Sequence, residues 1–98
     1  MRRFPGKRVV ITGAGSGFGR EFSLSFARRG WNVGVSDIDA DRAKETADQV
    51  KESGGSPWMY ECDVTKPEEL QDMADYFREK WGGVDIMVNN AGVAAAGY

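Results

Sequence analysis

The chain has 98 residues, of which 29% are charged, and a formal net charge of −2. This length suits one small domain, and we expect residues 1–98 to form a single domain. The balanced charge, without a run of basic residues, argues against nucleic acid or an anionic membrane as a partner.

A metal centre and a disulfide are also not expected. The chain contains one cysteine, Cys62, and no histidine, so it lacks the commonest metal ligand and any second cysteine for an internal bridge. No stretch is long and apolar enough to span a bilayer, and Met1–Gly6 lacks the apolar segment of a signal peptide. We therefore expect a cytoplasmic protein.

The first predicted element is an apolar strand at residues 7–12, which leads through glycines into a helix from about Gly17 to Arg29. Glycines let a backbone approach a pyrophosphate closely, and the N–H groups and dipole of a following helix attract an anion. The turn therefore predicts a phosphate cradle. Its members are Gly13, Ser16, Gly17, Phe18 and Gly19.

The glycine spacing narrows the kind of cradle. A Gly-x-Gly-x-x-Gly fingerprint fails in register, because its third glycine would fall on Phe18 or Arg20. A triphosphate loop would need Gly-Lys-Ser/Thr, and no lysine lies between Lys7 and Lys44. The pattern that fits is Thr-Gly-x-x-x-Gly-x-Gly, beginning at Thr12.

Within the first predicted helix, aromatic residues recur at every fourth position, and this stripe predicts core packing against the sheet. The stripe consists of Phe18, Phe22 and Phe26. Gly30 is expected to end the helix, and residues 31–36 form the second predicted strand.

Asp37 stands at the end of that strand, about twenty positions after the glycine turn. A carboxylate at this point can accept both hydroxyls of an adenosine ribose and would repel a 2′-phosphate, which favours NAD over NADP. Alternatively, Asp37 or Asp39 caps the helix predicted over residues 40–53. We expect Asp37 at the ribose and Asp39 at the cap.

A turn at residues 53–57 precedes the third predicted strand at residues 58–62. Thr65 and Glu68 have the spacing of a capping box, with Pro67 in the first helical turn. The buried face of this third helix is predicted to contain Leu70, Met73, Ala74, Phe77 and Trp81.

The fourth predicted strand, residues 84–88, runs directly into Asn-Asn-Ala-Gly at residues 89–92. This sequence, paired with the Thr-Gly-x-x-x-Gly-x-Gly turn, resembles the short-chain dehydrogenase/reductase family, and the resemblance extends over the whole chain. It implies cofactor contact at Asn90, Ala91 and Gly92, with Asn89 tying strand ends together. At position 16, where NADP-binding members of the family often have Lys or Arg, this chain has Ser16, which agrees with NAD as the cofactor.

The resemblance also implies a place for Asp63 and Val64 beside the adenine, although Asp63 could simply stabilise a turn. The order of elements predicts an α/β fold, a Rossmann-type parallel sheet with helices on both faces. The strand order should be 3-2-1-4, a truncated doubly wound fold with its ligand across the carboxyl ends of the first and fourth strands.

Members of the resembled family transfer hydride between nicotinamide and a carbonyl or alcohol, using a serine and a Tyr-x-x-x-Lys pair. Tyr76 and Lys80 match the letters but precede Asn-Asn-Ala-Gly, so we interpret them as an exposed pair on a helix. We therefore expect no catalytic residue in this chain and place those residues beyond Tyr98. The chain then represents the NAD-binding half of an oxidoreductase, inactive alone, whose parent acts on a small molecule.

Two alternatives stay open. The chain could be a stand-alone nucleotide-binding or folding module, or it could resemble a methyltransferase, which would leave residues 89–92 unexplained. In either case the apolar edge of the fourth strand is left uncovered, and it predicts self-association as a homo-oligomer.

Overall fold

The computed structural model describes residues 7–90, which form strands and helices in strict alternation. The strands are β1 (Arg8–Thr12), β2 (Asn32–Asp37), β3 (Ser56–Glu61) and β4 (Ile86–Asn89). The helices are α1 (Gly17–Ala27), α2 (Ala40–Glu52) and α3 (Pro67–Trp81). Each predicted element is present.

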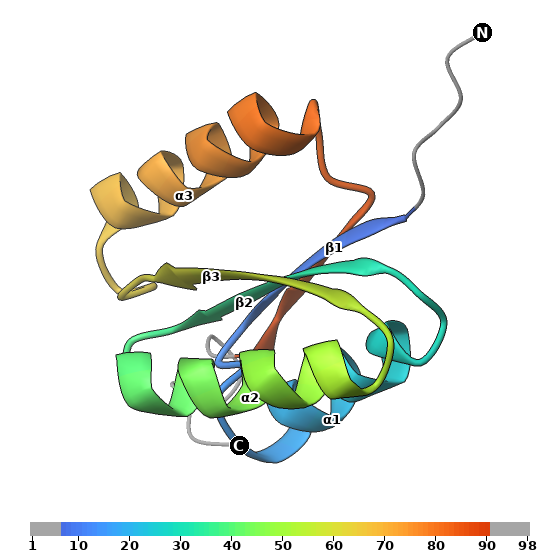
Figure 1. Ribbon diagram of the computed structural model, residues 1–98. Helices are drawn as coiled ribbons and strands as arrows, with labels where there is room; N and C mark the ends of the chain where they lie inside the picture. The colour runs from blue at the N-terminus through green and yellow to red at the C-terminus, as the bar shows by residue number, and fades with distance from the viewer. Residues whose placement is uncertain (1–6, 91–98) are drawn as a thin grey trace, which may run out of the picture.

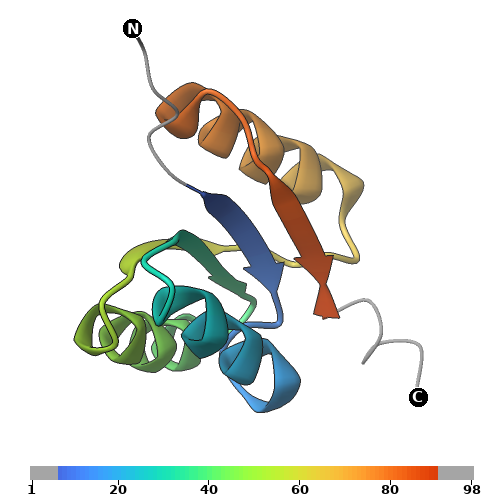
Figure 2. The same cartoon turned by 90° about the vertical axis from the view of Figure 1, so that its right-hand side faces the viewer.

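The sheet is parallel, and its strand order is β3-β2-β1-β4, as predicted. Helices α1 and α2 cover one face and α3 covers the other (Figure 1). Figure 2 shows β1 beside β4 with α3 behind them. The doubly wound arrangement follows because each parallel crossover must return over one face of the sheet.

Strand β1 is buried on both faces, which explains its continuous apolar sequence. Successive side chains point to opposite faces. Val9 and Ile11 therefore pack with α1 and α2, while Val10 packs beneath α3 with Met73 and Phe77. Two apolar layers thus hold the central strand in place.

The predicted packing of the aromatic stripe on α1 is wrong for two of its three residues. Phe18 is 74% exposed and Phe22 is 41% exposed, whereas Phe26 packs on Trp31 with ring centroids 4.7 Å apart. The helix instead turns its small residues inward, namely Gly19, Ser23 and Ala27. This row lies one position away from the aromatic row, and at Gly19 the helix lies too close to the backbone of Gly13 and Ala14 for a larger side chain.

Strand boundaries differ slightly from those expected. Strand β3 begins at Ser56, inside the segment predicted as a turn, and it includes Pro57. A proline is tolerated there because β3 is an edge strand. Strand β4 begins at Ile86 and extends to Asn89, past the predicted end at Val88.

The outer edge of β4 has no neighbouring strand in the sheet that residues 7–90 form. Ile86 and Met87 of this strand are 39% and 49% exposed. The expected uncovered edge is therefore present among these residues.

Within residues 7–90, no helix is both long and apolar enough to cross a membrane.

The start of β1 is joined to the start of β4 by Arg8 and Asp85. The Arg8 guanidinium lies 3.1 Å from the Asp85 carboxylate and also donates to the Trp81 carbonyl at the end of α3. The backbone N–H of Arg8 donates to the same carboxylate at 2.9 Å. These bonds with Arg8 hold the pKa of Asp85 below its usual value, although partial desolvation opposes the shift.

We predict that Asp85→Asn removes part of the acid sensitivity of folding. Because the folded-state pKa of Asp85 is lowered, its ionised form stabilises the fold above the unfolded pKa of about 3.8, and this stabilisation is lost as the pH falls through the folded value. Urea unfolding of the wild type and of Asp85→Asn, from neutral pH to about pH 3, measures the free energy of unfolding of each. The difference between the two proteins should become smaller as the pH falls. Asp48→Asn, which alters an exposed pair with Lys44, is the control. Parallel pH curves for wild type and Asp85→Asn would contradict the assignment.

Candidate functional site

The sequence motifs meet at one edge of the sheet. Thr12, at the end of β1, is in register with Ser36 of β2 and Asn89 of β4. Asp37 is in register with Glu61 at the end of β3. The residues that follow each strand therefore gather at the carboxyl ends, the edge where doubly wound sheets bind their ligands.

The glycine loop, residues 13–19, consists of the turn between β1 and α1 and the first three residues of α1, at this edge. Ser16 is the N-cap residue of α1 with an extended backbone, and its side chain makes no capping hydrogen bond. The N–H groups of Gly17, Phe18 and Gly19 belong to the first helical turn and so have no acceptor within the helix. Ser16, Gly17 and Phe18 are exposed, which leaves this end of α1 accessible to an anion.

Gly17 and Gly19 are favoured in this loop for different physical reasons. Gly17 has a φ of 58°, in the left-handed region that disfavours residues with a Cβ. A Cβ at Gly19 would overlap the Gly13 carbonyl group and the Cα of Ala14. The helix therefore begins with its backbone against the backbone of the turn.

Asp37 is half-buried beside the glycine loop. One of its carboxylate oxygens accepts the Gly15 N–H at 2.8 Å, and the other accepts the Asp39 N–H at 2.9 Å. A carboxylate oxygen has two lone pairs, so each retains the capacity to accept a hydroxyl. These bonds orient the group without saturating it.

Asp39 is the N-cap of α2, which confirms the predicted helix cap. Its carboxylate accepts the N–H groups of Asp41 and Arg42 at 3.0 and 3.2 Å. Of the two aspartates weighed from the sequence, the cap is therefore Asp39. Asp37 is available for another role.

Asp63 and Val64 lie in the turn after β3, and the capping box predicted nearby is wrong. The N-cap of α3 is Lys66, without a side-chain bond, and Pro67 occupies the first turn as expected. Thr65 donates its hydroxyl to Asp63 at 2.6 Å, and its N–H to the same oxygen at 2.9 Å. These bonds lower the pKa of Asp63, and they show the turn-stabilising role. Thr65 is thus held by Asp63 and does not cap α3.

Both asparagines at the end of β4 contact β1 and its turn. The Thr12 hydroxyl lies 3.0 Å from the Asn89 side-chain oxygen, so the predicted tie is present. The Asn90 side chain donates to the Gly13 carbonyl at 3.3 Å, a contact that the sequence did not indicate. Ala91 and Gly92 lie outside the described residues.

Two residues that sequence reasoning missed complete the loop. Gly15 occupies a variable position of the motif, yet it is buried between Asp37 and the start of α2. Arg20 donates to the Gly15 carbonyl. A cation in the first turn of a helix opposes the helix dipole, and this was the available signal that Arg20 has a particular partner.

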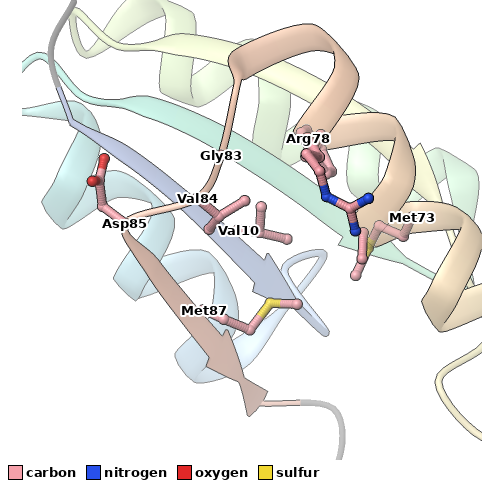
Figure 3. A pocket seen from close by; sticks show the side chains of 9 residues that line it. Val10, Met73, Arg78, Gly83, Val84, Asp85 and Met87 are labelled. Atoms are coloured by element: carbon pink, nitrogen blue, oxygen red, sulfur yellow. The ribbon is translucent and has the colours of Figure 1, made fainter. Parts of the chain in front are cut away.

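A cavity of about 390 Å³ lies away from this edge, between α3 and β4 (Figure 3). Its apolar wall includes Val10, Met73 and Met87, with Arg78 and Asp85 at the rim. None of the predicted cofactor residues lines it. It therefore belongs to the uncovered side of β4 and not to the glycine loop.

The other residues considered from the sequence are Tyr76, Lys80 and Cys62, and their contacts indicate structural roles. Tyr76 is half-buried, so the expected exposed pair is wrong in that respect. Its ring lies 5.0 Å from that of Tyr60, with Lys80 5.8 Å from the Tyr76 ring. Cys62 is a buried free thiol, and burial raises its pKa. Residues 7–90 contain no cluster of metal-ligating side chains.

The fold and its carboxyl-end edge define a doubly wound α/β protein of the dinucleotide-binding type. The profile of the family described as short chain dehydrogenase matches residues 7–98. The chain belongs to the short-chain dehydrogenase family.

Among similar proteins, 7α-hydroxysteroid dehydrogenase from Escherichia coli K12 is 47% identical over 90 residues, which cover 92% of this chain and 35% of that protein. A crystal structure described as 7α-hydroxysteroid dehydrogenase complexed with NADH and 7-oxo glycochenodeoxycholic acid matches with a TM-score of 0.81 and 45% identity, over 89% of this chain and 34% of that one. A short-chain type dehydrogenase/reductase from Mycobacterium marinum matches with a TM-score of 0.80 and 36% identity, over 86% of this chain and 33% of that one. The chain thus spans about a third of the length of these relatives.

We predict that Gly19→Ala is more destabilising than Gly17→Ala. The new methyl group at residue 19 would collide with the Gly13 backbone, which cannot move without displacing the loop, and overpacking of this kind costs about 1–3 kcal/mol. At residue 17 a Cβ meets open space and adds only the strain of a left-handed residue, roughly 1 kcal/mol. Urea unfolding measures both. Equal losses of stability would contradict the close backbone contact.

Proposed function

We propose that this chain is the NAD(H)-binding part of a short-chain oxidoreductase. The observation that carries the proposal is the convergence of the glycine loop, Asp37 and Asn90 at one edge of the sheet. In this proposal residues 1–98 form one dinucleotide-binding domain. Its cofactor contacts are Gly13, Ser16, Gly17, Phe18, Gly19, Asp37, Asp63, Val64, Asn90, Ala91 and Gly92.

The geometry of the described residues fits a dinucleotide. The first N–H groups of α1 are exposed and offer partial positive charge to a pyrophosphate. Asp37 is held in a fixed orientation, with lone pairs left for two ribose hydroxyls. Its negative charge would repel a 2′-phosphate, which supports NAD over NADP.

The bound nicotinamide would supply hydride transfer with a carbonyl or alcohol. In the proposal, this chain holds and orients the dinucleotide, while the catalytic residues and the small-molecule site belong to a longer, cytoplasmic parent protein. The 35% coverage of the E. coli relative supports this division. Tyr76 and Lys80 support it too, because they lie on α3 against β3 and not beside the glycine loop.

We predict that the 98-residue chain binds NAD more tightly than NADP, and that Asp37→Asn levels the two affinities. The substitution replaces one of the two acceptor oxygens with an NH2 donor and leaves the other as a weaker, neutral acceptor, and it removes the repulsion of a 2′-phosphate, so NAD binding should weaken about ten-fold or more. Calorimetric titration with each dinucleotide measures the effect. Enzymatic turnover is not expected from the chain alone.

The matched control is Asp75→Asn, which removes the same charge from an exposed position on α3, far from the glycine loop. Its affinities should equal those of the wild type. Equal binding of NAD and NADP by the wild type would contradict the proposed role of Asp37 in selecting NAD. Failure to bind either dinucleotide would show that this chain does not form a working cradle by itself.

We further propose that the isolated chain self-associates through β4. In the sheet that residues 7–90 form, no strand neighbours the outer edge of β4, where Ile86 and Met87 are partly exposed next to the apolar cavity under α3. Exposed edges of this kind pair with another chain, and edge lysines prevent such pairing. If the parent dehydrogenase pairs through β4 of each subunit, it is a homo-oligomer.

We predict concentration-dependent dimers in the wild type and a monomer in Ile86→Lys. A charge on the edge strand would have to be buried in a paired sheet, which is costly. Light scattering coupled to size exclusion, from dilute to concentrated protein, measures the mass. Glu79→Lys, an exposed change on α3, should dimerise like the wild type. A wild-type chain that stays monomeric at high concentration would contradict the proposal.

A further inference from the structure

Gly15 lies at the centre of the glycine loop, and the peptide groups on both of its sides are held by hydrogen bonds. The Gly15 N–H donates to Asp37 at 2.8 Å. A Cβ on Gly15 would lie 2.7 Å from the Arg42 Cβ and 2.8 Å from the Asp37 carboxylate. The loop is therefore packed directly on the start of α2.

The carbonyl of Gly15 accepts a hydrogen bond from Arg20, whose side chain is only 26% exposed. The donating Nη2 atom lies 2.6 Å from the Gly15 oxygen and 3.1 Å from the Glu45 carboxylate. The Nε atom donates to the hydroxyl of Thr46 at 2.9 Å. Because Thr46 is fully buried, these bonds anchor the guanidinium to α2.

A trans peptide is planar, and its N–H points opposite to its C=O. The peptide that carries the Gly15 carbonyl also carries the Ser16 N–H, and residues 7–90 contain no cis peptide bond. A carbonyl held toward Arg20 therefore fixes the Ser16 N–H in the opposite direction, away from the guanidinium. Ser16 itself is exposed at the mouth of the loop.

We propose that Arg20 is a positioning residue for dinucleotide binding: it sets the Gly15–Ser16 peptide and so the direction of the Ser16 N–H, next to the Ala14–Gly15 peptide whose N–H orients Asp37. The inference rests on the proposed function. Without the guanidinium, the Gly15 carbonyl loses its charged donor, and a glycine-flanked peptide is free to rotate. Rotation would turn the Ser16 N–H away from a bound phosphate.

The test is a fluorescence titration of the full chain with NADH. Arg20→Met should raise the Kd for NADH about ten-fold, and Arg20→Lys, which keeps one charged donor, should recover part of the loss. The matched controls remove the other partners of Arg20. Thr46→Val and Glu45→Gln should change the Kd by less than about two-fold, because the bond to Gly15 remains.

Amide hydrogen exchange without cofactor gives a second readout that packing alone would not move. Arg20→Met should accelerate exchange at Gly15, because release of the Gly15–Ser16 peptide loosens the adjoining Ala14–Gly15 peptide and its N–H bond to Asp37, whereas Thr46→Val should leave that rate unchanged. If Arg20→Met fails to fold, Arg20→Lys carries the comparison, and it should then show a raised Kd and faster Gly15 exchange.

These experiments distinguish failure of the proposed function from failure of the positioning role of Arg20. A wild-type chain that does not bind NADH overturns the proposed function, and the role of Arg20 is then decided by exchange alone. Unchanged Gly15 exchange in the folded Arg20 variants overturns the positioning role. So does an affinity loss in Thr46→Val as large as that in Arg20→Met, which would mean that Arg20 acts only by joining α1 to α2.

Discussion

The close approach of Gly19 to the Gly13 backbone is the constraint on which the rest of the molecule depends. It sets the rotation of α1 about its axis, so that Gly19, Ser23 and Ala27 face the core. It also places the first N–H groups of α1 at the carboxyl end of β1. A larger residue at the contact would move the helix away from the sheet and the donors away from the cradle.

From this contact the loop extends outward through polar bonds to its neighbours. Asp37 holds the Gly15 N–H, Arg20 holds the Gly15 carbonyl, and Asn90 holds the Gly13 carbonyl. These partners come from β2, α1 and the end of β4. A loop with many glycines would otherwise be flexible, so the surrounding elements supply the order that its own side chains cannot.

Helices cover the two faces of the sheet to different extents. On one face, Val9, Ile11, Val33 and Val35 are covered by α1 and α2. On the other face, α3 covers Val10 but leaves a cavity beside β4, where Met87 is half-exposed. Within residues 7–90, the uncovered apolar surface therefore lies beside β4, away from the glycine loop.

The sequence by itself determined the order of elements, the parallel sheet and the carboxyl-end position of the motifs. Those features follow from local patterns: apolar runs, glycine turns, the Asp39 cap and the sense of βαβ crossovers. The capping box at Thr65 failed because α3 begins one residue later, with Lys66 as its N-cap, and the Thr65 hydroxyl donates to Asp63 instead. Only the tertiary structure decided which face of α1 is buried and which partners hold Gly15. Both depend on how closely two segments approach, and spacing along one segment does not encode that distance.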